Sequence, residues 1–164
     1  MSIDVRRWAE DDWPAMWRII APAVRAGETY AYPRDADETA MKQAWTEVPA
    51  ATFVAVDEAG ELLGTYYVKA NQQGPGSHVC NCGYIVSEAA RGRGVATLMC
   101  EHSQMQAVAM EFRAMQFNLV VSTNTGAIRL WEKLGFETVG RLPGAFDHPR
   151  EGEVDALVMF KRLG

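Results

Sequence analysis

The stretch "VCNCGYIVSEAARGRGVATLMC", residues 79–100, places a strand, a turn and a helix start in immediate succession. Val79 to Val86 is apolar and β-branched enough to predict a strand. The turn "ARGRGVA" carries Gly92 and Gly94, which can adopt positive φ and let a ligand approach the backbone. The first amides of a helix lack intrahelical partners and attract anions. We therefore expect this turn to suit a phosphorylated small molecule, although a helix start that only needs glycine is the alternative.

Composition limits the functions that the chain can have. It has 164 residues and a formal net charge of −5, with its densest basic spot at Arg91 to Arg93. A general nucleic-acid surface is therefore not expected. No apolar run is long enough to span a membrane, and the N-terminus lacks the apolar core of a secretory signal. We expect a single domain, residues 1–164, in the cytoplasm, with no nucleic-acid or membrane partner.

Three cysteines, Cys80, Cys82 and Cys100, are expected to be free thiols, since their number is odd and no secretory signal precedes them. On a strand Cys80 and Cys82 point to one face, and no second pair of ligands stands nearby. Zinc needs about four ligands, so we expect no metal site. Asn81 between these cysteines faces the other side, which raises the question of what an amide does within an apolar strand.

The rest of the chain alternates strand and helix patterns. A strand at 3–8 is followed by helices at 10–24 and 35–48, a hairpin at 51–71, a strand at 77–86 and a helix at 90–112. A strand at 115–122, a helix at 125–136 and strands at 136–142 and 153–163 complete it, with a loop at 143–153. In the long helix an apolar row is expected to face the core: Val95, Leu98, His102, Met105, Ala109 and Phe112.

This order predicts an α/β (or α+β) domain with one mixed sheet. The unit from Val79 to Val121 should be a right-handed parallel crossover, whereas the hairpins on either side should be antiparallel. Helices are then expected to pack on the sheet.

Two motifs carry a resemblance to a known family. Arg91-x-x-Gly94-x-Ala96 follows one strand of the crossover, and "NTGAIRLWEKLGF", residues 124–136, follows the other. The turn is neither a Walker A loop, which needs Gly-Lys-Ser/Thr, nor a dinucleotide fingerprint, because Thr97 replaces the third glycine. The pair resembles the Gcn5-related N-acetyltransferase (GNAT) superfamily, whose helix motif is matched at Asn124, Ala127, Leu130, Lys133, Gly135 and Phe136.

The resemblance implies the GNAT fold, with helices on both faces of a mostly antiparallel sheet and a central parallel pair of strands that splay apart. Acetyl-CoA would lie in the gap, with its pantetheine arm on the backbone of Tyr84 and Val86. Its pyrophosphate would bind the amides of Arg91 to Ala96. The cofactor-binding residues implied in this way are Tyr84, Ile85, Val86, Arg91, Gly92, Arg93, Gly94, Val95, Ala96, Asn124 and Trp131.

The resemblance also implies direct attack of an amine on the thioester. A backbone N–H near Tyr84 would stabilise the oxyanion. Trp131 stands where many members have a tyrosine that protonates the thiolate, and an indole N–H cannot do this. Asn124 is expected to donate a hydrogen bond to the sulfur, with capping of the following helix as the alternative. No general base is assigned; His78, His102, Glu88 and Glu101 are candidates by type alone, and His102 is more simply a core residue.

The acceptor is suggested by a closer similarity to the proline-analogue (azetidine-2-carboxylate) N-acetyltransferases of yeasts and their bacterial relatives. It implies that Asn81 holds the substrate and that the backbone amides of Asn118 and Leu119 bind its carboxylate region. A buried Asn81 satisfied by a neighbouring loop is the alternative. A protein or peptide N-acetyltransferase and a non-catalytic acetyl-CoA sensor are the rival functions, and a homodimer is expected.

Overall fold

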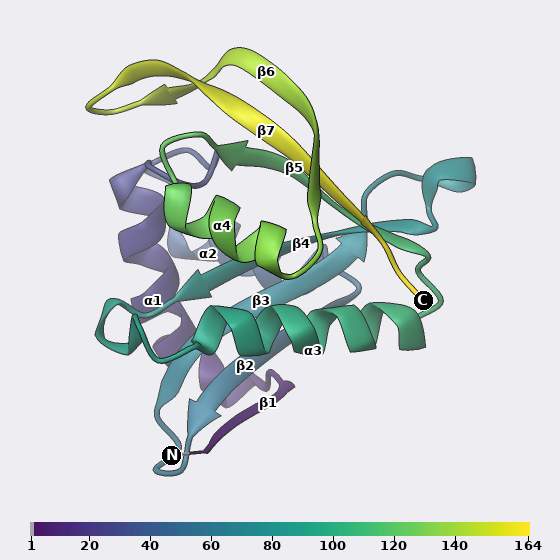
Figure 1. Cartoon of the computed structure of the whole chain (residues 1–164). Helices are drawn as coiled ribbons and strands as arrows, with labels where there is room; N and C mark the ends of the chain where they lie inside the picture. The colour runs from purple at the N-terminus through teal and green to yellow at the C-terminus, as the bar shows by residue number, and fades with distance from the viewer. Residues whose placement is uncertain (1) are drawn as a thin grey trace.

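The computed structural model describes residues 2–164 and contains the strands and helices in the predicted order (Figure 1). The strands are β1 (Ile3–Arg7), β2 (Ala51–Asp57), β3 (Leu62–Ala70), β4 (Val79–Val86), β5 (Ala114–Val121), β6 (Glu137–His148) and β7 (Gly152–Arg162). The helices are α1 (Trp13–Ala26), α2 (Glu38–Lys42), α3 (Val95–Ala109) and α4 (Thr125–Lys133). A π-helical turn, Gln43–Glu47, extends α2. Among the described helices, none is long and apolar enough to cross a membrane.

The seven strands form one sheet in the order β1-β2-β3-β4-β5-β7-β6. Within residues 2–164 only the central β4–β5 pair is parallel, and the other five pairs are antiparallel. The crossover from β4 through α3 to β5 is the unit that the opening stretch predicts. The predicted fold class, one mixed and mostly antiparallel sheet with a central parallel pair, is confirmed.

Helices cover both faces of the sheet (Figure 1). On one face, α3 and α4 enclose a core that includes Met99, Met115 and Trp131. On the other face, α1 and α2 enclose a second core around Met16 and Trp45. The two cysteines of β4 lie in the first core, as expected for small hydrophobic side chains. The odd-numbered residues of β4 therefore look towards α1 and α2.

Two details of the sequence prediction are wrong. Residues 143–148, expected in a loop, continue β6, because Pro143 and Gly144 fit a register shift of an edge strand rather than ending it. In α3 the buried residues include Met99, Ser103 and Ala107, whereas Met105 is 64% exposed. Apolar residues occur on nearly every side of this helix, so their spacing did not select the inward face.

Candidate active site

The parallel strands β4 and β5 are paired only where they begin. Val79 lies opposite Ala114 and Cys80 opposite Met115, and the described residues contain no further pair between these strands. Beyond this point β4 continues against β3, and β5 continues against β7. The place where the two strands diverge is called the fork here, and the space between them is the gap. One edge of β4 faces this gap, and the backbone groups on that edge require partners other than β5.

Asn81 lies at this fork. Its Nδ2 donates to the carbonyl oxygen of Gln116 on β5 at 3.0 Å, and its Oδ1 accepts from the Tyr67 hydroxyl at 3.3 Å. The adjacent Gly83 makes room for this arrangement, because a Cβ there would lie 2.6 Å from Cε2 of Tyr67. The amide that is unexpected in the sequence therefore links the strands where their pairing ends, and it is only 8% exposed.

Further along β4, the hydroxyl of Tyr30 occupies the free edge. The Tyr84 N–H donates to the Tyr30 oxygen at 2.8 Å, and the Tyr30 O–H donates to the Tyr84 carbonyl. Tyr30 comes from the loop after α1, and its ring stacks on Tyr32. Burial, followed by the nearby Tyr32, raises the pKa of Tyr30, so its phenol is neutral at physiological pH.

The turn between β4 and α3 has the features of an anion site. Gly92 and Gly94 adopt φ of 81° and 77°, in the left-handed region that glycine favours, and the space where each Cβ would lie is open. Helix α3 begins at Val95, directly after Gly94, so its first amides face this space. Val95 itself is buried, and Ala96 is half-buried.

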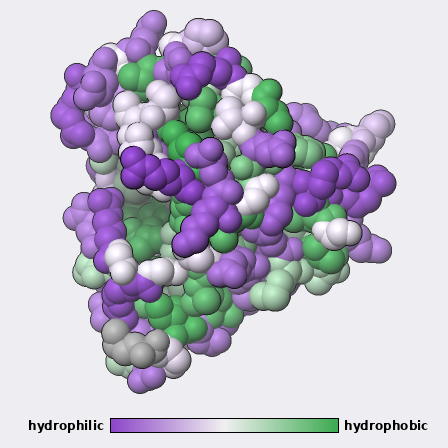
Figure 2. All heavy atoms as spheres, in the orientation of Figure 1, coloured by the Kyte–Doolittle hydropathy of each residue, from purple (hydrophilic) through white to green (hydrophobic). Residues whose placement is uncertain are grey.

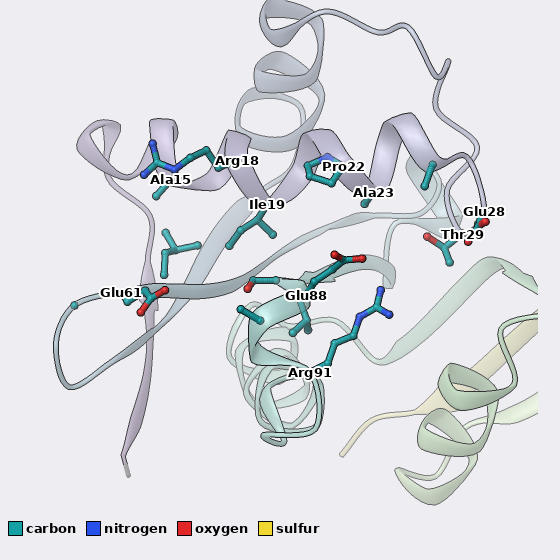
Figure 3. Close-up of a pocket in the computed structure, with 16 residues that line it drawn as sticks. Ala15, Arg18, Ile19, Pro22, Ala23, Glu28, Thr29, Glu61, Glu88 and Arg91 are labelled. Atoms are coloured by element: carbon teal, nitrogen blue, oxygen red, sulfur yellow. The ribbon is translucent and has the colours of Figure 1, made fainter.

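A cavity of about 680 Å³ adjoins the end of β4 beneath α1 (Figure 3). Val86 and Arg91, two of the predicted cofactor residues, are part of its lining. In Figure 3 Glu88 and Arg91 extend from the segment before α3 towards the space under α1. Figure 2 shows a hollow with a largely hydrophobic floor near the same region. The cavity therefore provides space for a ligand beside Val86 and Arg91, where the segment between β4 and α3 lies.

On the opposite side of the fork, β5 contains a bulge. Phe117 pairs with Met159 and Val120 with Leu157, so Asn118 and Leu119 face a single residue of β7. A bulge of this kind leaves backbone groups outside the ladder. The Asn118 side chain is held by amide contacts, since it accepts from Gln116 at 2.9 Å and donates to Asn71 at 2.7 Å.

Asn124 and Trp131 are placed by α4. Asn124 caps the helix, because its Oδ1 accepts from the Ala127 N–H at 3.4 Å. Its Nδ2 has no described partner within residues 2–164, so capping and donation to a sulfur atom are compatible. Trp131 is buried against the rings of Tyr84 and Phe117, at centroid distances of 5.1 and 5.0 Å.

The family is decided by the match of residues 3–136 to the model of the acetyltransferase (GNAT) family. This chain belongs to the GNAT family. N-acetyltransferase aca1 of Schizosaccharomyces pombe is 36% identical over 116 residues, 67% of this chain and 53% of the relative. The chain thus spans about half the length of that curated relative.

Solved GNAT structures have the same fold. A Gcn5-related N-acetyltransferase from Kribbella flavida superposes with a TM-score of 0.94 and 41% identity, covering 98% of both chains. The phosphinothricin acetyltransferase of Sinorhizobium meliloti in complex with acetyl-CoA has a TM-score of 0.87 and 22% identity, covering 100% of this chain and 90% of that one. The predicted enzyme class, an N-acetyltransferase, is confirmed by the family match and the Kribbella flavida structure, and the Sinorhizobium meliloti structure supports the fold alone.

The predicted cofactor residues come together at the end of β4 and the turn before α3. Ile85 differs from Tyr84 and Val86 because its side chain is buried in the core beneath α1, whereas theirs pack against the core on the other face of the sheet. The prediction that Ile85 binds the cofactor therefore has less structural support than the same prediction for Tyr84 and Val86. None of the individual site roles is tested by these comparisons, and each stays a prediction.

Two of the candidate bases are placed differently, since Glu88 lines the same cavity as Val86 and Arg91, whereas His102 packs on the other face of the sheet. His102 Nδ1 lies 2.7 Å from the Tyr66 hydroxyl on the α3 face of the sheet, and burial lowers the pKa of this imidazole. This arrangement favours a structural role for His102.

The sequence did not predict two contacts of the site, that of Tyr67 with Asn81 and that of Tyr30 with Tyr84. Strand alternation could have suggested the first, but no local pattern indicates the second.

Proposed function

We propose that this GNAT enzyme transfers the acetyl group of acetyl-CoA to the amine of a small molecule, and that the acceptor is an amino acid or a proline analogue. The observation that carries the proposal is the free edge of β4 at Tyr84, which leads directly to the glycine turn before α3. A pantetheine arm offers amide groups that can pair with such an edge, while the turn suits its pyrophosphate.

In the proposed reaction the neutral amine attacks the thioester carbon. A C–N bond forms as the carbonyl π electrons move to oxygen, and the Tyr84 N–H stabilises the resulting oxyanion. The C–S bond then breaks, and the thiolate leaves with the electron pair. Asn124 Nδ2 donates a hydrogen bond to the sulfur, water returns a proton to it, and water accepts the proton that the amine loses.

The acceptor assignment rests on the two sides of the fork. The bulge at Asn118 and Leu119 supplies backbone groups that can bind a carboxylate. Asn81 faces the same gap, and its bond from Tyr67 is long enough, at 3.3 Å, to be exchanged for a substrate amine or carboxylate. An amide can both donate and accept, which fits an amino acid.

The ion pair between Arg150 and Glu28 supports a small acceptor over a peptide. It joins the end of the β6–β7 hairpin to the loop that carries Tyr30. A peptide acceptor needs an open groove, and a bridge between these two segments restricts access from this side. A homodimer and a cytoplasmic location stay predictions from the sequence.

The proposal is tested with purified enzyme, acetyl-CoA and a panel of amino acids, imino acids and short peptides, with free thiol as the readout. We expect thiol release with one or more amino or imino acids, and much less with the same compounds as carboxyl amides. Release only with peptides would replace the small-molecule proposal. Tight binding of acetyl-CoA without release for any acceptor would favour a sensor.

A further inference from the structure

The hydroxyl of Tyr30 touches the same backbone N–H that is expected to bind the thioester oxygen. It accepts from the Tyr84 N–H at 2.8 Å and donates to the Tyr84 carbonyl. This phenol therefore replaces the strand partner that β5 does not provide. A thioester oxygen bound to the Tyr84 N–H would take the position of the phenol oxygen, and the hydroxyl must turn to a new acceptor.

A thioester oxygen at this position would be an acceptor beside the hydroxyl, in addition to the Tyr84 carbonyl. A single N–H would be an incomplete oxyanion hole, since oxyanion holes commonly combine several hydrogen-bond donors. We propose that Tyr30 is a catalytic residue whose hydroxyl donates a second hydrogen bond to the thioester oxygen and to the oxyanion formed from it. The inference rests on the proposed role of the Tyr84 N–H. It involves no proton transfer, so Tyr30 keeps its proton throughout the reaction.

The surroundings of Tyr30 limit how far it can move. Its ring stacks on Tyr32 with centroids 5.9 Å apart and meets the edge of Trp45 at 6.3 Å. Trp45 is fully buried and is fixed by a hydrogen bond from its Nε1 to Thr65 at 3.1 Å. A small rotation of the phenol is therefore easier than its departure, and the hydroxyl stays beside the Tyr84 backbone.

The electrostatic setting also suits a hydrogen-bond donor. Burial raises the pKa of Tyr30, and the neighbouring Tyr32 raises it further. The phenol is therefore protonated over the whole pH range in which the amine can attack. Trp131 has no hydroxyl, and the Tyr84 hydroxyl bonds to Ser103 of α3, whereas the Tyr30 hydroxyl contacts the Tyr84 backbone itself.

The test compares Tyr30→Phe with wild type in two measurements. The first is the kcat for the best acceptor, with the dissociation constant of acetyl-CoA measured separately. Loss of one oxyanion donor typically lowers kcat by about 10²- to 10³-fold, and we expect an effect of this order with a much smaller change in affinity. Tyr66→Phe is the matched control, because it removes a hydroxyl bonded to His102 on the other face of the sheet.

The second measurement is the carbonyl ¹³C shift of bound [1-¹³C]acetyl-CoA, which needs no acceptor. We expect a downfield shift on binding to wild type and to Tyr66→Phe, and a smaller shift with Tyr30→Phe. An unchanged carbonyl shift in Tyr30→Phe overturns the proposal, whatever happens to kcat. A changed shift with unchanged kcat overturns the catalytic role. If no acceptor reacts with wild type, the proposed acceptor class fails, but the carbonyl shift still decides the role of Tyr30.

Discussion

The two halves of β4 belong to one strand but have different backbone partners. The first half, from Val79 to Asn81, is joined to β5 by strand pairing and by the Asn81 side chain. The second half, from Tyr84 to Val86, has no pairing with β5 among the described residues, and the Tyr30 hydroxyl holds its free edge. From Cys80 to Val86, the strand pairs with β3 without interruption.

This difference separates stability from ligand binding within eight residues. Backbone groups that are hydrogen-bonded within the sheet contribute to stability. Backbone groups that are bonded to a single side-chain hydroxyl can exchange that hydroxyl for a ligand. Asn81 marks the boundary, because among the described residues it is the last on β4 whose side chain bonds to the backbone of β5. A substitution in the first half should therefore change the free energy of unfolding, with an added effect on acceptor binding at Asn81, and one that affects the second half should change mainly turnover.

The largest effect on stability is expected from Asn81→Ala. It removes the bond to the Gln116 carbonyl and the bond from Tyr67, leaving both groups underpaired in a nearly buried site. Loss of such a partner costs about 1–3 kcal/mol, measurable by urea unfolding. Gln73→Ala, which removes an exposed side-chain amide from the loop before β4, is the control and should be near neutral. An equally stable Asn81→Ala protein would show that the fork does not depend on this amide.

A smaller, pH-dependent effect is expected in the second half. Because burial raises the folded-state pKa of Tyr30, its contribution to stability is complete below the ordinary tyrosine pKa of about 10 and decreases as the pH rises above it. Tyr30→Phe should therefore lose stability less steeply than wild type above about pH 10, by up to ~1.4 kcal/mol per pH unit. Identical slopes in urea titrations of the two proteins would show that Tyr30 titrates normally.

The sequence predicted the order of elements and the mixed sheet because each segment carries its own local signal. The glycines before α3, the "NTGAIRLWEKLGF" motif and the hairpin turn at Gly60 are all short-range features. The same locality explains the error at residues 143–148, where Pro143 and Gly144 indicate a loop but the chain continues along the edge of the sheet.

The site was predicted less completely than the fold, because it depends on contacts between distant residues. The sequence could place Asn81 and Tyr84 on β4 and Asn124 at the start of a helix. It could not show that Asn81 reaches across to Gln116, 35 positions away, or that Tyr30 meets Tyr84, 54 positions away. Those contacts depend on where the strands diverge and on how the loop after α1 folds back over the sheet.

The most direct test of the account is amide hydrogen exchange along β4, resolved by NMR, with and without acetyl-CoA. The account predicts that acetyl-CoA slows exchange at Tyr84 and Val86, whose amides face the gap, and leaves exchange at Cys80 nearly unchanged, since that residue is already paired on both sides. Slowing that is uniform along the strand, or confined to its first half, would contradict the claim that the second half of β4 holds the cofactor.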